Sequence, residues 1–209
     1  MRLNFDVPSP LQYFTSLVQS DEHFPLLEAA VSLAQDEYPE LDVQQVLGDV
    51  DQLLARLKRR VPPDAPAMQR LRALNQFFFQ DLNFGGNVND YYDPDNSFVH
   101  VLLKTRRGIP ITLAVLWLEL AQGMDLHARG LSFPGHFMVK VNLPKGQVVM
   151  DPFTGPLGKL TLTMKWPGKD KPRACRSMPC ASSSHNTARV MGMPRRVLSS
   201  TCTKLLSGS

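Results

Sequence analysis

Apolar side chains recur every three or four positions through about the first eighty residues, a spacing that places them on one face of a helix. Serine and aspartate commonly begin helices, because their side chains cap free backbone N–H groups. Ser9 stands before Pro10 and Asp42 stands before Val43, so both are expected to cap a helix. We therefore expect a helical N-terminal subdomain. It covers residues 1–82, with helices at residues 9–18, 24–36, 42–60 and 65–80.

A further helix is expected over residues 111–122, where nearly every side chain is apolar. The polar exceptions are Thr112, Glu119 and Gln122, which lie seven and three positions apart and so share one narrow face. Pro110 suits the first turn of this helix, since an N–H there would have no partner within the helix. The pattern predicts a helix that is mostly buried.

The apolar period then shortens to two, which is typical of a half-buried strand. Residues 137–141 alternate between apolar and polar side chains, residues 144–146 provide a turn, and residues 147–150 form the next expected strand. His136 begins one strand of this predicted hairpin and Asp151 follows the other. Antiparallel pairing would make these two residues neighbours.

A histidine oriented by a carboxylate, at the start of a buried helix, is the arrangement that activates a cysteine thiol. Here the first helical turn contains Pro110 and Thr112, and no cysteine precedes residue 175. Thr112 is the nearest hydroxyl, but a hydroxyl is far less acidic than a thiol and needs a strong base beside it. His136, Asp151 and Thr112 are therefore the candidate catalytic residues of a degenerate triad. The alternatives for His136 are a structural role and a ligand-binding one.

Residues 83–96 are predicted to form a long loop, since glycine, asparagine, aspartate and proline cluster there around Tyr91 and Tyr92. The loop lacks the lysine–threonine pair of a phosphate-binding loop and the closing glutamate of a calcium loop, so neither nucleotide nor metal is expected. Its aspartates are expected to cap a helix. We expect the two tyrosines to lie over the His136 end of the hairpin and to contact a partner.

Arg106 and Arg107 precede the central helix. A guanidinium there suits bidentate binding of a carboxylate. The alternatives are ordinary solvated cations or ion pairs with Asp93 and Asp95.

Four sequence blocks follow one another along the chain: residues 89–98 (NDYYDPDNSF), 106–113 (RRGIPITL), 133–137 (FPGHF) and 151–155 (DPFTG). Together they resemble the bacterial SirB-type family of transglutaminase-like proteins, and the resemblance covers about residues 8–155. It implies an α+β fold whose papain-like core, residues 83–155, packs a buried helix on a small antiparallel sheet. It also implies tetratricopeptide-type repeats at the C-terminus.

The resemblance also bears on individual residues. His136 and Asp151 match the transglutaminase-like histidine and aspartate of the family, whose members commonly have proline and isoleucine where a cysteine would stand. The residues expected to bind a ligand are Tyr91, Tyr92, Arg107 and Gly135.

Charge divides the chain at residue 155. Residues 156–209 contain ten Lys or Arg and one Asp, a net charge of +9, whereas the first 155 residues have 13 bases and 18 acids, a net charge of −5. All three cysteines lie in this basic, low-order tail, but their spacing is a weak zinc signal. A nucleic-acid or membrane-surface arm is the second interpretation. A shifted reading frame is the interpretation we favour, because composition and pattern change within a few residues of Gly155.

With 43% hydrophobic and 20% charged residues, the composition is typical of one globular domain. No apolar run spans a membrane and no signal peptide is evident, so we expect a cytoplasmic protein without cofactor or metal. The expected function is non-catalytic binding of a protein or peptide, with nucleic acid an unlikely partner. A residual amidohydrolase or peptidase using Thr112, His136 and Asp151, and a structural role in a larger assembly, are the alternatives.

Overall fold

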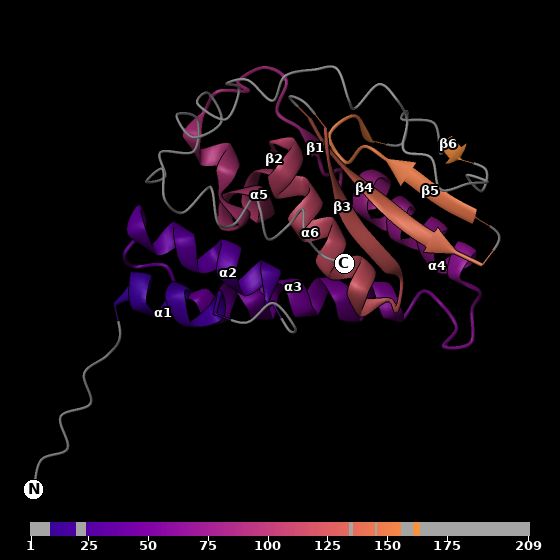
Figure 1. Ribbon diagram of the computed structural model, residues 1–209, viewed down its shortest axis with the longest axis horizontal. Coiled ribbons are helices and arrows are strands. Elements are labelled where there is room, and N and C mark those ends of the chain that lie inside the picture. Colours follow the sequence, from indigo (N-terminus) through magenta and orange to yellow (C-terminus); the bar gives the residue numbers. More distant parts are fainter. Residues whose placement is uncertain (1–8, 20–23, 134–135, 145, 156–160, 164–209) are drawn as a thin grey trace, which may run out of the picture.

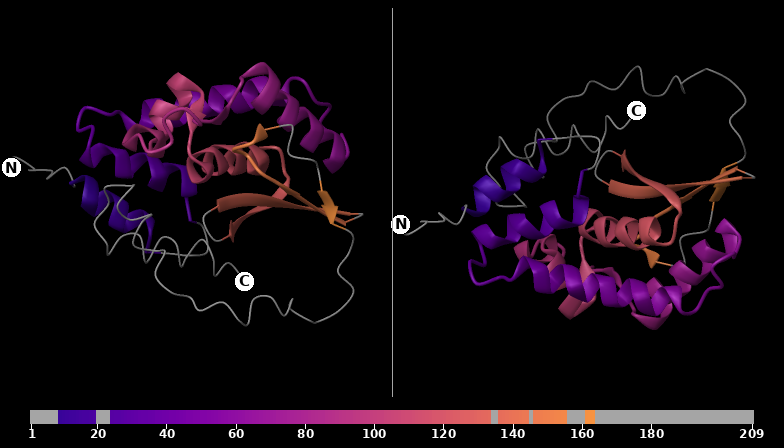
Figure 2. Two further views of the ribbon diagram at one scale, coloured as in Figure 1. Left: turned by 90° about the horizontal axis from the view of Figure 1, so that it is seen from above. Right: turned by 90° about the horizontal axis from the view of Figure 1, so that it is seen from below.

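Helix α6, Pro110–Gly123, lies between a four-stranded sheet and the other helices (Figures 1 and 2). The computed structural model describes residues 9–19, 24–133, 136–144, 146–155 and 161–163. Helices and a small antiparallel sheet share one chain, so the α+β class expected from the sequence is confirmed.

Helix α6 is enclosed because apolar side chains cover nearly its whole circumference. Ile109 has extended backbone angles and precedes the helix, and Pro110 takes the first helical position as predicted. The buried α6 residues are Pro110, Thr112, Leu113, Ala114, Val115, Leu116, Trp117, Leu120 and Ala121. The predicted buried helix is therefore confirmed.

The N-terminal helices agree with the sequence pattern at their starts. Helix α1, Pro10–Leu17, begins with a capping box between Ser9 and Gln12, and α3, Val43–Lys58, is capped by the Asp42 side chain. Helix α2, Leu26–Ser32, continues into a 3-10 turn, Leu33–Asp36. Leu11, one of the apolar residues of α1, is 65% exposed.

The expected helix at residues 65–80 divides into α4, Ala67–Asn75, and a π-helix, η2, Gln76–Asp81. Three consecutive phenylalanines of η2, Phe77 to Phe79, are all buried. The guanidinium of Arg60 lies over the Phe77 ring, 4.8 Å from its centroid, and forms an ion pair with Asp81. Apolar spacing alone does not separate a π turn from an α turn, so the sequence did not predict this one.

The sheet has the order β3-β4-β5-β6, with every neighbouring pair antiparallel. Strands β4, His136–Leu143, and β5, Gly146–Met150, are the predicted hairpin. The sequence analysis missed β3, His127–Phe133, in which β-branched residues are absent. Its Gly130 is needed where it stands, because a Cβ there would lie 2.5 Å from the Phe137 ring.

Strand β6, Thr161–Thr163, lies within residues 156–209, the segment expected to be a low-order tail. It pairs with β5 through Gln147 and Val149. Residues 161–163 of this segment therefore extend the sheet. The rest of the tail, including its cysteines, lies outside the described residues.

A short parallel pairing connects the loop before the site to the start of α6. Strand β1, Gly85–Gly86, pairs with β2, Arg107–Gly108. Between them lie a 3-10 turn, η3, Pro94–Ser97, and helix α5, Val99–Thr105. Arg106 ends α5 in the left-handed conformation with φ 62°, which turns the chain sharply into β2.

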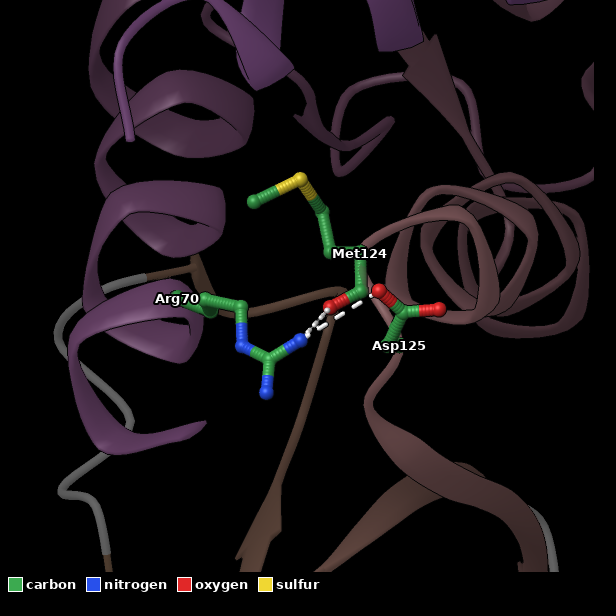
Figure 3. Close-up of polar contacts among 3 residues, drawn as sticks. All are labelled: Arg70, Met124 and Asp125. Carbon is green, nitrogen blue, oxygen red and sulfur yellow. Dashed lines mark hydrogen bonds and ion pairs between the residues drawn. The ribbon is translucent and has the colours of Figure 1, made fainter. Parts of the chain in front are cut away.

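Arg70 of α4 connects the helical half to the end of α6 (Figure 3). Its Nη1 donates to the backbone carbonyl of Met124, at 3.0 Å, and approaches Oδ2 of Asp125 at 3.4 Å. Carbonyls at a helix C-terminus lack partners within the helix. Arg70 therefore satisfies one of them and supplies the positive charge that a helix end favours.

One hydrophobic cluster runs from Leu27 to Met150 and crosses the expected subdomain boundary at residue 82. Within it, Trp117 is fully buried, and its Nε1 donates to Oδ1 of Asn75 at 3.1 Å. The helical half and the sheet half therefore share a core. In the part of the chain that the structure describes, no helix is long and apolar enough to span a bilayer.

Trp117→Phe should lower the free energy of unfolding by about 2–4 kcal/mol, because it leaves a void and removes the donor to Asn75. Chemical denaturation measures this loss. Asn75→Ala should cost less in the Trp117→Phe background than in the wild type, since the shared hydrogen bond is already gone. Fully additive losses would contradict this account of the pair.

Candidate functional site

His136 and Asp151 meet at one end of the β4–β5 hairpin, as the sequence predicted. The register pairs Val139 with Met150, which places the start of β4 beside the residue that follows β5. Nε2 of His136 lies 2.8 Å from Oδ2 of Asp151, and the two side chains are 33% and 15% exposed. The pair is thus accessible through the histidine rather than through the carboxylate.

The turn after β5 fixes the Asp151 carboxylate. Its Oδ1 accepts from the backbone N–H of Phe153 at 2.8 Å, and its Oδ2 accepts from Oγ1 of Thr154 at 3.1 Å. A carboxylate held this way favours the His136 tautomer with its proton on Nε2, so Nδ1 of the neutral ring is left as an acceptor or base. Such a pair can orient a ligand or take up a proton.

Phe153 connects this pair to the loop that carries the tyrosines. The Phe153 ring meets His136 edge-to-face, with centroids 6.4 Å apart, and Tyr91 at 5.8 Å. The N–H of Gly86 donates to the carbonyl of Phe153 at 3.0 Å, and a Cβ at Gly86 would lie 2.4 Å from the ring. Phe153 therefore packs directly on the loop backbone and places Tyr91 near His136.

Asn96 organises this loop from inside. It is 4% exposed, and its Nδ2 donates to the carbonyls of Asp90 and Tyr91 at 2.7 and 3.3 Å. Its Oδ1 accepts from Nδ2 of Asn87 at 2.9 Å. Our sequence analysis did not single out Asn96, although a buried asparagine in a turn-rich segment commonly bonds to nearby backbone groups.

The loop aspartates act as caps and bridging groups. The Asp93 side chain accepts from the N–H of Asp95 and so caps η3. The 3-10 turn that Asp93 caps begins at Pro94. Asp95 accepts from the Tyr38 hydroxyl, and this hydrogen bond raises the pKa of Tyr38 to about 12.

Thr112, Glu119 and Gln122 were expected to share one polar face of α6, but they differ in burial. Thr112 is 3% exposed at the start of α6, whereas Glu119 is half-buried and Gln122 is exposed. Burial closes the Thr112 hydroxyl to bulk solvent. A hydroxyl in that position is poorly suited to attack a substrate that must arrive from solution.

The two arginines before α6 are engaged by the fold. Nη1 of Arg107 donates to the backbone carbonyls of Asn83 and Arg106. The Arg106 guanidinium lies 4.7 Å from the centroid of Phe84, and burial, with a smaller contribution from Arg56, lowers its pKa. Neither guanidinium forms an ion pair with a described carboxylate. Gly135, the remaining expected binding residue, lies outside the described residues.

A separate polar pocket of about 230 Å³ lies among α2, α3 and α6, and it contains Glu28, Asp51 and Glu119. Burial, and then the charge of Asp51, raise the pKa of Glu119. Among the described side chains, no group of three or more His, Cys, Asp or Glu is arranged to hold a metal ion. Glu119 therefore belongs to a pocket on the helical side and not to the His136 end of the hairpin.

A protein-family model described as the Transglutaminase-like superfamily matches residues 44–166, more than half of the 209-residue chain. The match begins within α3 and includes α6, the hairpin and β6. It therefore contains both His136 and Asp151.

Several relatives share this region. A UPF0162 protein of Xylella fastidiosa is 38% identical over 135 residues, which are 65% of this chain and 48% of that protein. A UPF0162 protein of Vibrio cholerae is 27% identical over 150 residues, 70% of this chain and 56% of that protein. F-box only protein 21 of Homo sapiens is 27% identical over 146 residues, 59% of this chain and 23% of that protein.

The chain spans about half the length of the bacterial relatives described above. No solved structure matches it.

Gly86→Ala should destabilise the protein by about 1–3 kcal/mol, because the added methyl group must displace the Phe153 ring. The movement should also shift the NMR resonances of the His136 ring. Gly48→Ala is the matched control, since a Cβ there meets nothing within 4 Å and alanine favours the helix. Equal destabilisation by both variants would contradict the proposed packing.

Glu119→Gln should raise the melting temperature by about 1–2 °C at neutral pH, because it removes a half-buried charge. The pKa of Glu119 is raised in the folded protein, so its negative charge destabilises the fold at pH values above that raised pKa. This destabilisation disappears as the pH falls below the ordinary value of 4.5. Thermal melts from pH 3 to pH 8 test this trend, with exposed Glu37→Gln as control. A gain that persists in acid would contradict it.

Proposed function

The chain belongs to the transglutaminase-like superfamily, and on that basis we propose that it is a SirB-type member that binds a protein or peptide without catalysing a reaction. The binding site in this proposal combines the His136–Asp151 pair with the loop that carries Tyr91 and Tyr92. For the longer relatives, we further propose tetratricopeptide-type repeats beyond the matched region.

The observation that carries this proposal is the first turn of α6. A thiol acyltransferase needs a nucleophile beside its histidine, but Pro110, Ile111 and Thr112 occupy this turn. Thr112 is 3% exposed, so its hydroxyl is closed to an incoming substrate. The pair therefore keeps the orienting and hydrogen-bonding parts of a catalytic site without an accessible nucleophile.

The surface beside the pair supports binding. Tyr92 is 76% exposed and packs edge-to-face on Tyr91, with ring centroids 5.3 Å apart. Tyr91 in turn contacts Phe153, which contacts His136. An exposed aromatic group on a well-ordered loop is a common recognition element.

The comparisons also favour a module that works within larger proteins. The matched region is 48% of one relative and 23% of another. A structural role in an assembly fits the same observation and is the third of the three hypotheses. In the longer proteins, regions outside the matched segment would also help to determine which partners bind.

His136→Ala should reduce partner capture at least fivefold, whereas His136→Gln should retain it. The glutamine amide can replace the Nε2 donor to Asp151 but has no imidazole base. Quantitative mass spectrometry of proteins captured from a bacterial lysate by the immobilised wild type and variants measures this difference. Circular dichroism confirms that each variant is folded.

An amide-hydrolysis assay distinguishes the enzymatic alternative. Ammonia release from a glutamine-containing peptide is followed from pH 5 to pH 9 for the wild type, Thr112→Val and His136→Gln. We expect no turnover above that of the two variants. Turnover that is lost in both variants would show a working Thr112–His136 pair and overturn the proposal.

A further inference from the structure

The loop beside the site exposes two large apolar side chains. Val88 is 75% exposed and Tyr92 is 76% exposed, and the third such side chain among the described residues, Leu11, lies on α1. Exposed apolar side chains that gather in one place indicate a contact surface, whereas single ones are ordinary. We name residues 88–95 the acidic-aromatic loop.

This loop also has a one-sided charge. It contains Asp90, Asp93 and Asp95 and no Lys or Arg, and Asp90 and Asp95 are exposed. None of the three forms an ion pair with a described Lys, Arg or His. Arg106 and Arg107, the two arginines before α6, are directed at Phe84 and at backbone carbonyls instead. The acidic-aromatic loop therefore carries three carboxylates that have no ion-pair partner among the described residues.

Hydrogen bonds within the loop hold its conformation. The buried Asn96 amide bonds the carbonyls of Asp90 and Tyr91, and Oδ1 of Asn87 accepts from the N–H of Asp90 at 3.2 Å. The Tyr92 ring packs edge-to-face on Tyr91, and Tyr91 packs edge-to-face on Phe153. Side chains on such a frame lose little conformational freedom on binding, so the surface is organised in advance.

We propose that the acidic-aromatic loop binds a cationic, arginine-rich segment of a partner protein. This inference rests on the proposed function and specifies the partner's chemistry. A guanidinium can stack on the exposed Tyr92 ring while its N–H groups donate to the Asp90 carboxylate. The aliphatic part of the arginine side chain can cover Val88.

Charge complementarity selects this occupant over others. A nucleic acid or an acidic peptide would bring negative charge to three aspartates, which is unfavourable. An uncharged apolar segment would leave the aspartates without a cation to pair with. The chain's own residues 156–209, with a net charge of +9, are the competing occupant, so the experiment must distinguish them from a partner.

The test uses the full chain and a fluorescent peptide of alternating arginine and serine, at low ionic strength where exposed charges are least screened. Fluorescence anisotropy should show that Tyr92→Ala weakens binding about fivefold and Asp90→Asn about threefold. Tyr92→Phe, which keeps the ring face, should stay within about twofold of the wild type. A glutamate–serine peptide should not bind.

Matched controls remove the same groups elsewhere. Leu11→Ala deletes an exposed apolar side chain on α1, and Asp64→Asn deletes an exposed carboxylate outside the loop. Both should leave the affinity unchanged. Equal losses with Asp64→Asn and Asp90→Asn, or no loss with Tyr92→Ala, would overturn the proposal by showing general charge attraction.

Carbodiimide crosslinking identifies the occupant. With a lysine–serine peptide, mass spectrometry should find Asp90 joined to the peptide. Asp90 joined only to lysines of residues 156–209, even with excess peptide, would overturn the partner proposal in favour of the chain's own segment. Failure of the proposed function would instead appear as Thr112-dependent amide turnover, which peptide binding does not report.

Discussion

Burying a helix that is apolar on almost every side is the constraint that organises this fold. Helix α6 has no solvated face wide enough to lie at a surface, so the sheet must cover one side and the N-terminal helices the other. The Trp117–Asn75 hydrogen bond and the Arg70 contact with the end of α6 lie on the helical side of this arrangement. The same enclosure buries Thr112 and removes the one candidate hydroxyl from solvent.

The candidate site is formed by the hairpin and the 83–96 loop, outside the enclosed helix. The β4–β5 register brings His136 and Asp151 together, and the turn after β5 fixes the carboxylate through its own backbone and Thr154. The same turn contains Phe153, whose backbone carbonyl accepts a hydrogen bond from the N–H of Gly86 in the 83–96 loop. The loop that carries Tyr91 and the imidazole–carboxylate pair are therefore parts of one packed unit, connected through the Phe153 ring.

Local patterns predicted the features that depend on neighbouring residues in the chain. The caps at Ser9 and Asp42, the proline at the start of α6, and the hairpin ends all follow from residue type and spacing. The hairpin prediction extended to the site because an antiparallel register determines which ends meet. The family match places the chain in the same class of fold as the resemblance did.

Features set by tertiary contacts were missed. Strand β3 has little strand propensity and forms because β4 offers a partner edge, while Gly130 is there to admit the Phe137 ring. Strand β6 has no sequence signal of its own in this interpretation, because it forms by pairing with β5. Burial of Thr112 depends on elements packed around the start of α6, which helical periodicity does not report. The core also continues across residue 82, where a turn-rich composition had suggested a boundary.

The Tyr38–Asp95 hydrogen bond connects the segment after α2 to the loop beside the site. With a pKa of about 12, the phenol keeps its proton at any pH a cell experiences. Ionisation of Tyr38 therefore does not break this contact between two distant stretches of chain. The carboxylate of Asp95 is thus anchored to the N-terminal half of the chain.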